Sequence, residues 1–393
     1  MDKWRMNTPV LLQTGFRVFF LGAAFYAVLG MVVWFLFYVA GGNIFVAMPM
    51  TVWHGHEMVF GFTMAVVAGF LLTAVMNWTG RPTLTGVPLL ILFMLWLIAR
   101  VLAFMPRSFP EWPMATANLS FMMFLLIAVI RPIVAVRQWR QSAVLSKVAL
   151  ILAGGVVFHA GLAQANLLAE RRALRFAVYM LVSLIFTIGR RVIPFFVERG
   201  VGYSVTLRRY RLLDIASLML LVVFVVCDIF WYQPYVVAGS SAALVIVHSI
   251  RLRVWYTRGV WERPLLWVLF AGYAFLILGF VLKSAAILGR QPDDAALHAW
   301  TAGGIGIFTL GMMTRVAWGH TGRLIAEPPR SVVGMFTLVI LAAMVRVFLP
   351  LIRPESYIMW IAVSQILWIF AFGWYLIVYA PILVNPRPDG RIG

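Results

Sequence analysis

The sequence predicts an all-α protein, a polytopic membrane helix bundle, and two observations carry this prediction. Hydrophobic residues make up 63% of the 393 residues, and charged residues make up only 11%. A soluble domain has about 45–50% apolar and about 25% charged residues, so this chain needs a lipid bilayer as the solvent of its apolar surface. The apolar runs are also long and unbroken, which favours spanning helices over the alternating pattern of a membrane β-barrel.

About twelve apolar segments approach the roughly 20 residues that a spanning helix needs. They lie at residues 14–40, 54–76, 86–105, 113–136, 143–165, 174–196, 210–231, 235–256, 264–287, 297–317, 331–350 and 356–383. Polar, basic or Gly/Pro-rich stretches separate them, and none of these separators is long enough for a soluble domain. We therefore predict a single integral membrane domain over residues 1–393.

The net charge of +19 reflects basic loops more than a nucleic-acid partner, because no Lys/Arg-rich run is long enough to form a nucleic-acid-binding tail. With the N-terminus in the cytoplasm, 23 of the 32 Lys and Arg residues fall on the cytoplasmic side. This bias predicts that both termini are cytoplasmic. Arg171, Arg172 and Arg175 fall on the other side. They are either an anion contact, for instance to haem propionates, or a tolerated exception to a statistical rule.

Two of the segments echo each other. The second runs from His56 to Thr79-Gly80-Arg81, and the tenth runs from His298 to Thr321-Gly322-Arg323, with the same spacing from histidine to threonine and glycines at matching positions. The sixth segment ends similarly at Thr187-Ile188-Gly189-Arg190, without a histidine at its head. The echo indicates either a loose repeat of four-helix units or a chance likeness between Gly-rich spans, whose small residues suit close helix packing.

The six histidines are the strongest candidates for chemistry, because histidines in membrane spans are rare and mark ion paths, proton relays or cofactors. The predicted topology places four of them at the extracytoplasmic side and two toward the cytoplasm: His54, His56, His159 and His298, against His248 and His320. Imidazole suits copper, zinc and haem iron. For His248, an ordinary hydrogen-bonded histidine is the favoured interpretation.

The pair His54 and His56 heads a span, with Glu57 next to it. Side chains at positions i and i+2 diverge in a regular helix, but at a helix start, with Gly55 between them, both imidazoles can reach one metal ion. Glu57 is then either a carboxylate that hydrogen-bonds to the other ring nitrogen of a metal-binding imidazole, or a proton relay. The alternative is a carboxylate held at a helix N-terminus by the helix dipole.

Three further charges lie near or within the predicted spans: Arg100, Asp228 and Lys283. Each is isolated in the sequence. Each can extend its side chain toward the membrane surface.

Several motifs together resemble the NnrS family of bacterial membrane proteins. They are Trp53-His54-Gly55-His56-Glu57-Met58, Gly61-Phe62, Gly69-Phe70-Leu71-Leu72-Thr73-Ala74-Val75, Asn77-Trp78-Thr79-Gly80, Gly189-Arg190-Arg191-Val192-Ile193-Pro194-Phe195-Phe196, Leu297-His298-Ala299, Met313-Thr314-Arg315 and Gly319-His320-Thr321-Gly322-Arg323. The likeness extends over nearly the whole chain. Met76 departs from it, at a position where the family often has proline.

The resemblance implies a multi-pass inner-membrane protein that binds haem and copper. It also implies a role in denitrifying bacteria and in relief of nitric oxide and nitrosative stress. The motif match carries over His54, His56, Glu57, His298 and His320 as metal-site positions, whereas His159 and His248 rest on their predicted placement. The single cysteine, Cys227, and the lack of a Cys-x-x-Cys-His run exclude covalent c-type haem, so a b-type haem is expected.

We therefore assign copper to His54 and His56, with His159 as a possible third ligand, and haem b to His298 or His159. The inner histidines, His248 and His320, either hold a second haem or anchor the cytoplasmic face. The metals would bind or turn over nitric oxide, with quinol or another electron donor if the protein is an oxidoreductase. The rival hypothesis is a transporter or sensor without redox turnover.

Overall fold

The computed structural model describes residues 8–42, 46, 48–106, 108–289 and 293–391, and the regular structure in these residues is helical throughout. The prediction of an all-α helix bundle is confirmed. Ten helices are long and apolar enough to cross a membrane, and Gly86–Leu102 is a shorter apolar helix. Each of the twelve predicted segments corresponds to one continuous helical rod.

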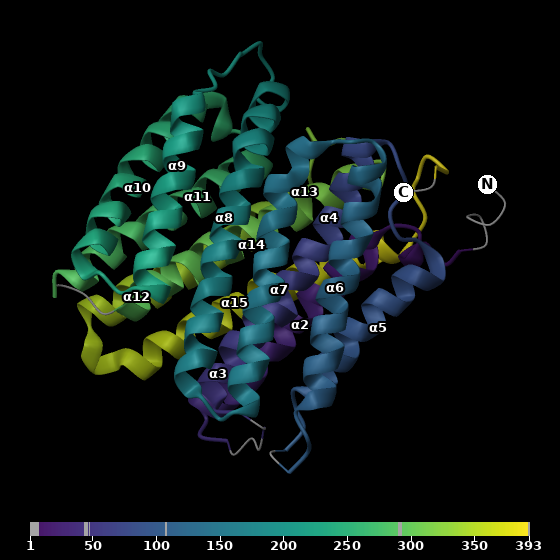
Figure 1. Cartoon of the computed structure of the whole chain (residues 1–393). Coiled ribbons are helices and arrows are strands. Elements are labelled where there is room, and N and C mark those ends of the chain that lie inside the picture. Colours follow the sequence, from purple (N-terminus) through teal and green to yellow (C-terminus); the bar gives the residue numbers. More distant parts are fainter. Residues whose placement is uncertain (1–7, 43–45, 47, 107, 290–292, 392–393) are drawn as a thin grey trace. The chain divides into compact units, whose positions relative to one another are not determined.

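The rods follow one another along the chain with short connections (Figure 1). In order they are α2 (Gly15–Tyr38), α3–η2–α4 (Met50–His56, Glu57–Thr63, Met64–Thr79), α5 (Gly86–Leu102), α6 (Trp112–Ala135), α7 (Ser142–Ala163), α8 (Leu167–Gly200), α9–η4 (Arg211–Val225, Val226–Phe230), α10 (Pro234–Trp255), α11 (Pro264–Ile287), α12–η6–α13 (Asp293–His298, Ala299–Ile305, Gly306–His320), α14 (Ser331–Ile352) and α15 (Tyr357–Val384).

The chain forms two compact units. Unit 1 contains the chain up to residue 180 together with residues 313–325 and the chain from residue 372, and unit 2 contains residues 181–312 and 326–371. In unit 1, α2 packs on α4 and α5 packs on α6; in unit 2, α10 packs between α9 and α11 (Figure 1). The prediction of a single membrane domain stays a prediction.

Residues with restricted or permissive backbones set several helix ends. Pro234 and Pro264 are the first residues of α10 and α11, where proline's missing N–H is not needed and its fixed φ suits the helix. Gly80 ends α4 with φ +66°, and Gly322 follows α13 with φ +81°. Both angles lie in the left-handed region, which glycine adopts without a steric cost.

Large apolar side chains lie on the surface of the described residues. Leu212 is 81% exposed, Ile377 76% and Val87 67%. Water would disfavour so many exposed apolar groups, and contiguous apolar surface of this kind marks a membrane or protein contact. The protein is therefore a multi-pass membrane protein whose helices turn apolar faces to lipid.

Among the described residues, three rods contain a π-helical segment, and two of these segments are seven residues long and start directly after a histidine. The segment η2 spans Glu57–Thr63 after His56, and η6 spans Ala299–Ile305 after His298. A π segment is rare, widens the helix and is frequent at functional sites. The shared position supports the repeat suggested by the sequence for the second and tenth spans. The sixth span differs, because α8 continues to Gly200 through its Gly189-Arg190 motif.

Candidate functional site

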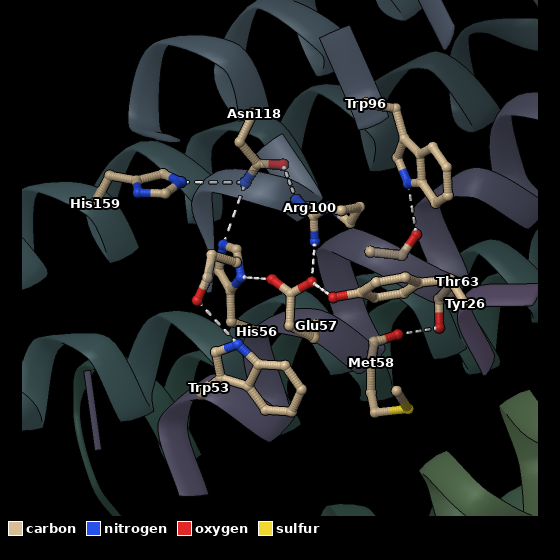
Figure 2. Close-up of polar contacts among 12 residues, drawn as sticks. Tyr26, Trp53, His56, Glu57, Met58, Thr63, Trp96, Arg100, Asn118 and His159 are labelled. Atoms are coloured by element: carbon tan, nitrogen blue, oxygen red, sulfur yellow. Dashed lines mark hydrogen bonds and ion pairs between the residues drawn. The ribbon is translucent and has the colours of Figure 1, made fainter. Parts of the chain in front are cut away.

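A buried network of polar side chains lies within unit 1 (Figure 2). Its six members come from separate positions on the first rods of the chain and are each 6% exposed or less: Tyr26 on α2, His56 on α3, Glu57 on η2, Arg100 on α5, Asn118 on α6 and His159 on α7. We call this set the Glu57 network. Polar groups buried in a membrane bundle need partners inside the protein, and such groups are functional candidates by default.

The carboxylate of Glu57 is the centre of the network. Its Oε1 atom lies 2.6 Å from His56 Nδ1, and its Oε2 atom accepts a hydrogen bond from Arg100 Nη1 at 2.8 Å. The hydroxyl of Tyr26 also donates to Oε2. The Arg100–Glu57 pair is fully buried, so their opposite charges compensate each other where neither could be left alone at low cost.

The hydrogen bonds of Asn118 determine the protonation pattern of both imidazoles. Arg100 Nη2 donates to Asn118 Oδ1 at 3.0 Å, so the amide NH₂ faces the other way. That Nδ2 atom lies 3.3 Å from His56 Nε2 and 3.1 Å from His159 Nε2 (Figure 2). Because an amide nitrogen only donates, both Nε2 atoms act as acceptors, and His56 carries its proton on Nδ1 and donates to Glu57.

The π segment brings Glu57 and its neighbours into this position. Trp96 Nε1 donates to the carbonyl of Gly61 at 3.0 Å, which satisfies a backbone group within the segment. A Cβ atom on Gly61 would lie 2.7 Å from Arg100 Nη1 and 2.8 Å from the Tyr26 ring. Glycine at this position is therefore required for the network to close over the helix backbone.

The imidazoles of His56 and His159 fit a metal ion. Their Nε2 lone pairs converge on one atom, and the ring centroids are 5.5 Å apart. Two imidazoles on one ion, each bonded at about 2.0–2.1 Å, have ring centres roughly 5–6 Å apart. The bond from His56 Nδ1 to Glu57 reproduces the carboxylate–histidine arrangement that orients metal-binding imidazoles. His159 Nδ1 is buried and makes no hydrogen bond within the described residues.

The other histidines take different positions. His54 stacks on Trp34, with ring centroids 4.7 Å apart, so the structure brings His56, Glu57 and His159 together and places His54 against α2. His320, at the end of α13 in unit 1, contacts the Phe16 ring at 5.9 Å. Among the described residues, no group of three or more His, Cys, Asp and Glu side chains is arranged to hold a metal ion.

Two predicted site histidines belong to unit 2. His298 Nδ1 lies 2.8 Å from the carbonyl oxygen of Asp294, and Arg346 Nη2 lies 3.2 Å from His298 Nε2. His248 is fully buried, and its two nitrogens contact Ser217 and Tyr273. Both nitrogens of His248 therefore have a side-chain hydroxyl as partner. Arg171 and Arg172 lie exposed near the start of α8.

Three charges in or near the spans that are isolated in the sequence have ion-pair partners in the structure. Arg100 pairs with Glu57. Lys283 Nζ lies 2.9 Å from Asp228 and 3.0 Å from Asp293, and the Lys283 and Asp228 side chains are 4% and 1% exposed. In a membrane interior, the low dielectric favours such pairing over separate charged groups. The partners are far apart in sequence, so spacing along one helix could not reveal them.

Sequence reasoning also missed Tyr26 and Asn118. Asn118 is a polar residue inside an apolar segment, and that signal alone could have marked it as a buried hydrogen-bonding group. Tyr26 offers no such signal, because tyrosine is common among the aromatic residues of membrane spans.

The family comparison covers almost the whole chain. The NnrS protein family model matches residues 10–387. No curated protein matches the chain. The match includes every member of the Glu57 network and the two π segments that follow His56 and His298. The chain therefore belongs to the NnrS family, whose members are bacterial membrane proteins of the nitric oxide response.

Proposed function

We propose that the protein binds copper at His56 and His159, binds a b-type haem, and uses these metals to bind or turn over nitric oxide. One observation carries the copper assignment. Two buried Nε2 lone pairs converge on the amide nitrogen of Asn118, with Glu57 hydrogen-bonded behind one of them. This is a donor set for a soft or borderline metal ion, and the Glu57 carboxylate holds the His56 ring from its other nitrogen.

Each member of the network has a separate task in this proposal. His56 and His159 hold the ion, and Asn118, which spans their Nε2 atoms, turns away to admit it. Glu57 keeps the His56 proton on Nδ1 and so keeps Nε2 free. Arg100 holds the charge of Glu57 in place. Copper, when bound, supplies an open coordination position for a diatomic ligand such as nitric oxide.

The network also contains a proton donor next to the site. The Tyr26 hydroxyl donates to Glu57, which in turn contacts His56. Reduction of nitric oxide consumes protons, and a hydroxyl–carboxylate pair can hold and pass a proton at Glu57 Oε2. This is the catalytic role that we propose for Glu57.

The haem ligand is proposed from the remaining histidines. Both nitrogens of His248 already have hydrogen-bond partners. His320 is partly exposed at the end of α13, with Arg323 and Arg387 nearby. Arginines bind carboxylates well, as haem propionates require. We therefore place His320 first and His298 second as axial ligands.

The proposal also includes an orientation in the membrane. The protein lies in the bacterial inner membrane with both termini on the cytoplasmic side, and the Glu57 network then lies nearer the extracytoplasmic side.

The test is metal analysis and absorption spectroscopy of the purified full-length protein, with and without nitric oxide. We expect a Soret band, bound copper and a spectral change with nitric oxide. His56→Ala and His159→Ala should lose copper, and the matched control His54→Ala should retain it. Absence of both metals from the wild-type protein would refute the proposal. Loss of copper from the His54 and His56 variants, with copper retained in His159→Ala, would return the site to the His54–Gly55–His56 motif.

Electron supply separates an enzyme from a sensor. If the protein turns over nitric oxide, a quinol or another one-electron donor should support consumption of nitric oxide, and Glu57→Gln should slow it while copper stays bound. A spectral response to nitric oxide without consumption would favour sensing or sequestration. Parallel spectra of His320→Ala and His298→Ala identify the axial ligand by the loss of the Soret band.

A further inference from the structure

A second buried pair of titratable groups lies in unit 2, where Tyr273 of α11 meets His248 of α10. The Tyr273 hydroxyl oxygen lies 2.6 Å from His248 Nδ1, and both residues are 0% exposed. A phenol donates to an imidazole nitrogen at this distance. The pair is therefore a phenol with a base already hydrogen-bonded to it.

The other contacts of His248 leave its Nδ1 atom as the acceptor of the phenol proton. Its Nε2 atom lies 3.1 Å from Ser217 Oγ, so the Nε2 proton has an acceptor while Nδ1 receives the phenol. The Phe186 ring stacks on the imidazole with centroids 3.7 Å apart. An aromatic face stabilises a cation that lies over it, so this stack favours the imidazolium formed by proton transfer.

Tyr273 also has an aromatic neighbour at the end of α10. The Trp255 ring lies edge-on to Tyr273 with centroids 5.3 Å apart, at the last residue of α10. Arg251 lies over Trp255 and pairs with Asp214, whose side chain is 34% exposed. The Tyr273 phenol is thus shielded from water, and only the Trp255 ring lies between it and the end of α10.

We propose that Tyr273 is a redox-active tyrosine with His248 as its proton acceptor, and that it reduces small neutral one-electron oxidants of the nitrogen oxide class. With nitrogen dioxide as the oxidant, the O–H bond of Tyr273 breaks and an N–H bond forms at His248 Nδ1. The electron passes to nitrogen dioxide, which becomes nitrite, and Tyr273 is left as a neutral phenoxyl radical. The positive charge then lies on the His248 imidazolium, under the Phe186 ring, instead of on a phenol radical cation, which is a far stronger acid than imidazolium.

The site suits such an oxidant because the oxidant is small, uncharged and soluble in the bilayer that surrounds the protein. This inference goes beyond the metal chemistry proposed above and does not rest on it. Tyr273 and His248 make their contacts within unit 2, whereas the Glu57 network lies in unit 1.

The chain supplies its own control in Tyr375 and Tyr379 of α15. These residues are also 0% exposed, and their rings stack with centroids 4.7 Å apart. Their hydroxyls make no hydrogen bond within the described residues, so they have no base. Burial is matched between the two sites, and the imidazole partner is the difference.

The test generates one oxidising equivalent by flash photolysis of a ruthenium tris-bipyridine complex with a sacrificial acceptor. The full-length protein is used without haem or copper. We expect a tyrosyl radical signal in electron paramagnetic resonance that disappears in Tyr273→Phe and persists in Tyr375→Phe. His248→Gln, which keeps a hydrogen-bond acceptor but lacks the base, should lower the radical yield severalfold.

A second measurement needs no variant. Exposure of the wild-type protein to nitric oxide and oxygen should nitrate Tyr273 more than Tyr375 and Tyr379, as mapped by mass spectrometry. An unchanged radical in Tyr273→Phe, or preferential nitration of Tyr375 or Tyr379, would overturn the proposal. A full radical yield in His248→Gln would overturn the role of His248 as proton acceptor. Because metal-free protein is used, failure here is distinguishable from failure of the copper and haem proposal.

Discussion

The helix pair that carries His56 in unit 1 and the pair that carries His298 in unit 2 share one packing plan. In each, a 24-residue helix, α2 or α11, packs on a rod with a seven-residue π segment that starts after the histidine. In each, an arginine from the following helix reaches the head of that segment. Arg100 contacts Glu57, and Arg346 contacts His298.

Glycines mark the matching contacts between the two helices of each pair. A Cβ atom on Gly30 would meet Met58, and one on Gly279 would meet Trp300. Two matching glycines of the two rods also face equivalent residues of the partner helices. A Cβ on Gly61 would meet Tyr26, and one on Gly303 would meet Phe275. A Cβ on Gly69 would meet Phe19 and Phe20, and one on Gly311 would meet Val268 and Leu269. The correspondence at three levels supports a repeat over chance likeness.

The two pairs differ in the side chains that carry charge. The position of Glu57 is Ala299 in the second pair, and the position of Tyr26 is Phe275. The first pair therefore closes a polar network around a carboxylate, and the second closes an apolar contact, with its histidine bound to Arg346. These two differences at equivalent positions therefore distinguish the candidate metal centre of the first pair from the apolar helix contact of the second pair.

The largest effect should come from making the first pair like the second. Glu57→Ala leaves Arg100 buried without its carboxylate, and breaking a buried pair in this way costs about 3–5 kcal/mol. We expect the free energy of unfolding in detergent to fall by that order. The double variant Glu57→Ala/Arg100→Met should recover much of the loss, because both charges are removed together. Wild-type stability in Glu57→Ala would show that Arg100 does not depend on this carboxylate.

A smaller loss of stability is expected from alanine at the glycines of η2 and η6, one in each helix pair. A Cβ on Gly61 would lie 2.7 Å from Arg100 Nη1, and one on Gly303 would lie 2.3 Å from Phe275 Cδ1. Overpacking of this kind typically costs about 1–3 kcal/mol, so both alanine variants should melt earlier. Only Gly61→Ala should also lower the copper content. Equal copper loss in both variants would mean that the second pair supports the metal site too.

The smallest effect is expected at the glycines that follow the two rods. Gly80 and Gly322 have φ of +66° and +81°, so alanine at either position should cost about 1–2 kcal/mol. Gly322→Ala should cost more, because its Cβ would lie 3.3 Å from Arg387 and Asp389, whereas the Gly80 position is open. Thermal unfolding of the two variants side by side measures the difference. The reverse order would show that the Arg387–Asp389 segment yields freely.

The sequence predicted much of the frame and part of the site. Hydropathy located all twelve rods, and the motif around His54, His56 and Glu57 located one edge of the polar network. The pairing of Glu57 with Arg100 was not predictable, because topology gives depth in the membrane but not the direction in which a helix turns its side chains. For the same reason the sequence could not show that His54 and His56 point to different partners. The structure shows it, because His54 stacks on Trp34.

Composition alone determined that this protein is a bundle of membrane helices, since no other solvent accommodates so many apolar residues and no other regular structure satisfies the backbone in lipid. The sequence also determined the family motifs and the spacing of the two related spans. Only the tertiary structure decided that Tyr26, Arg100, Asn118 and His159 meet at Glu57, and that Tyr273 meets His248. Those contacts depend on the rotation of helices about their axes, which packing sets and hydropathy does not record.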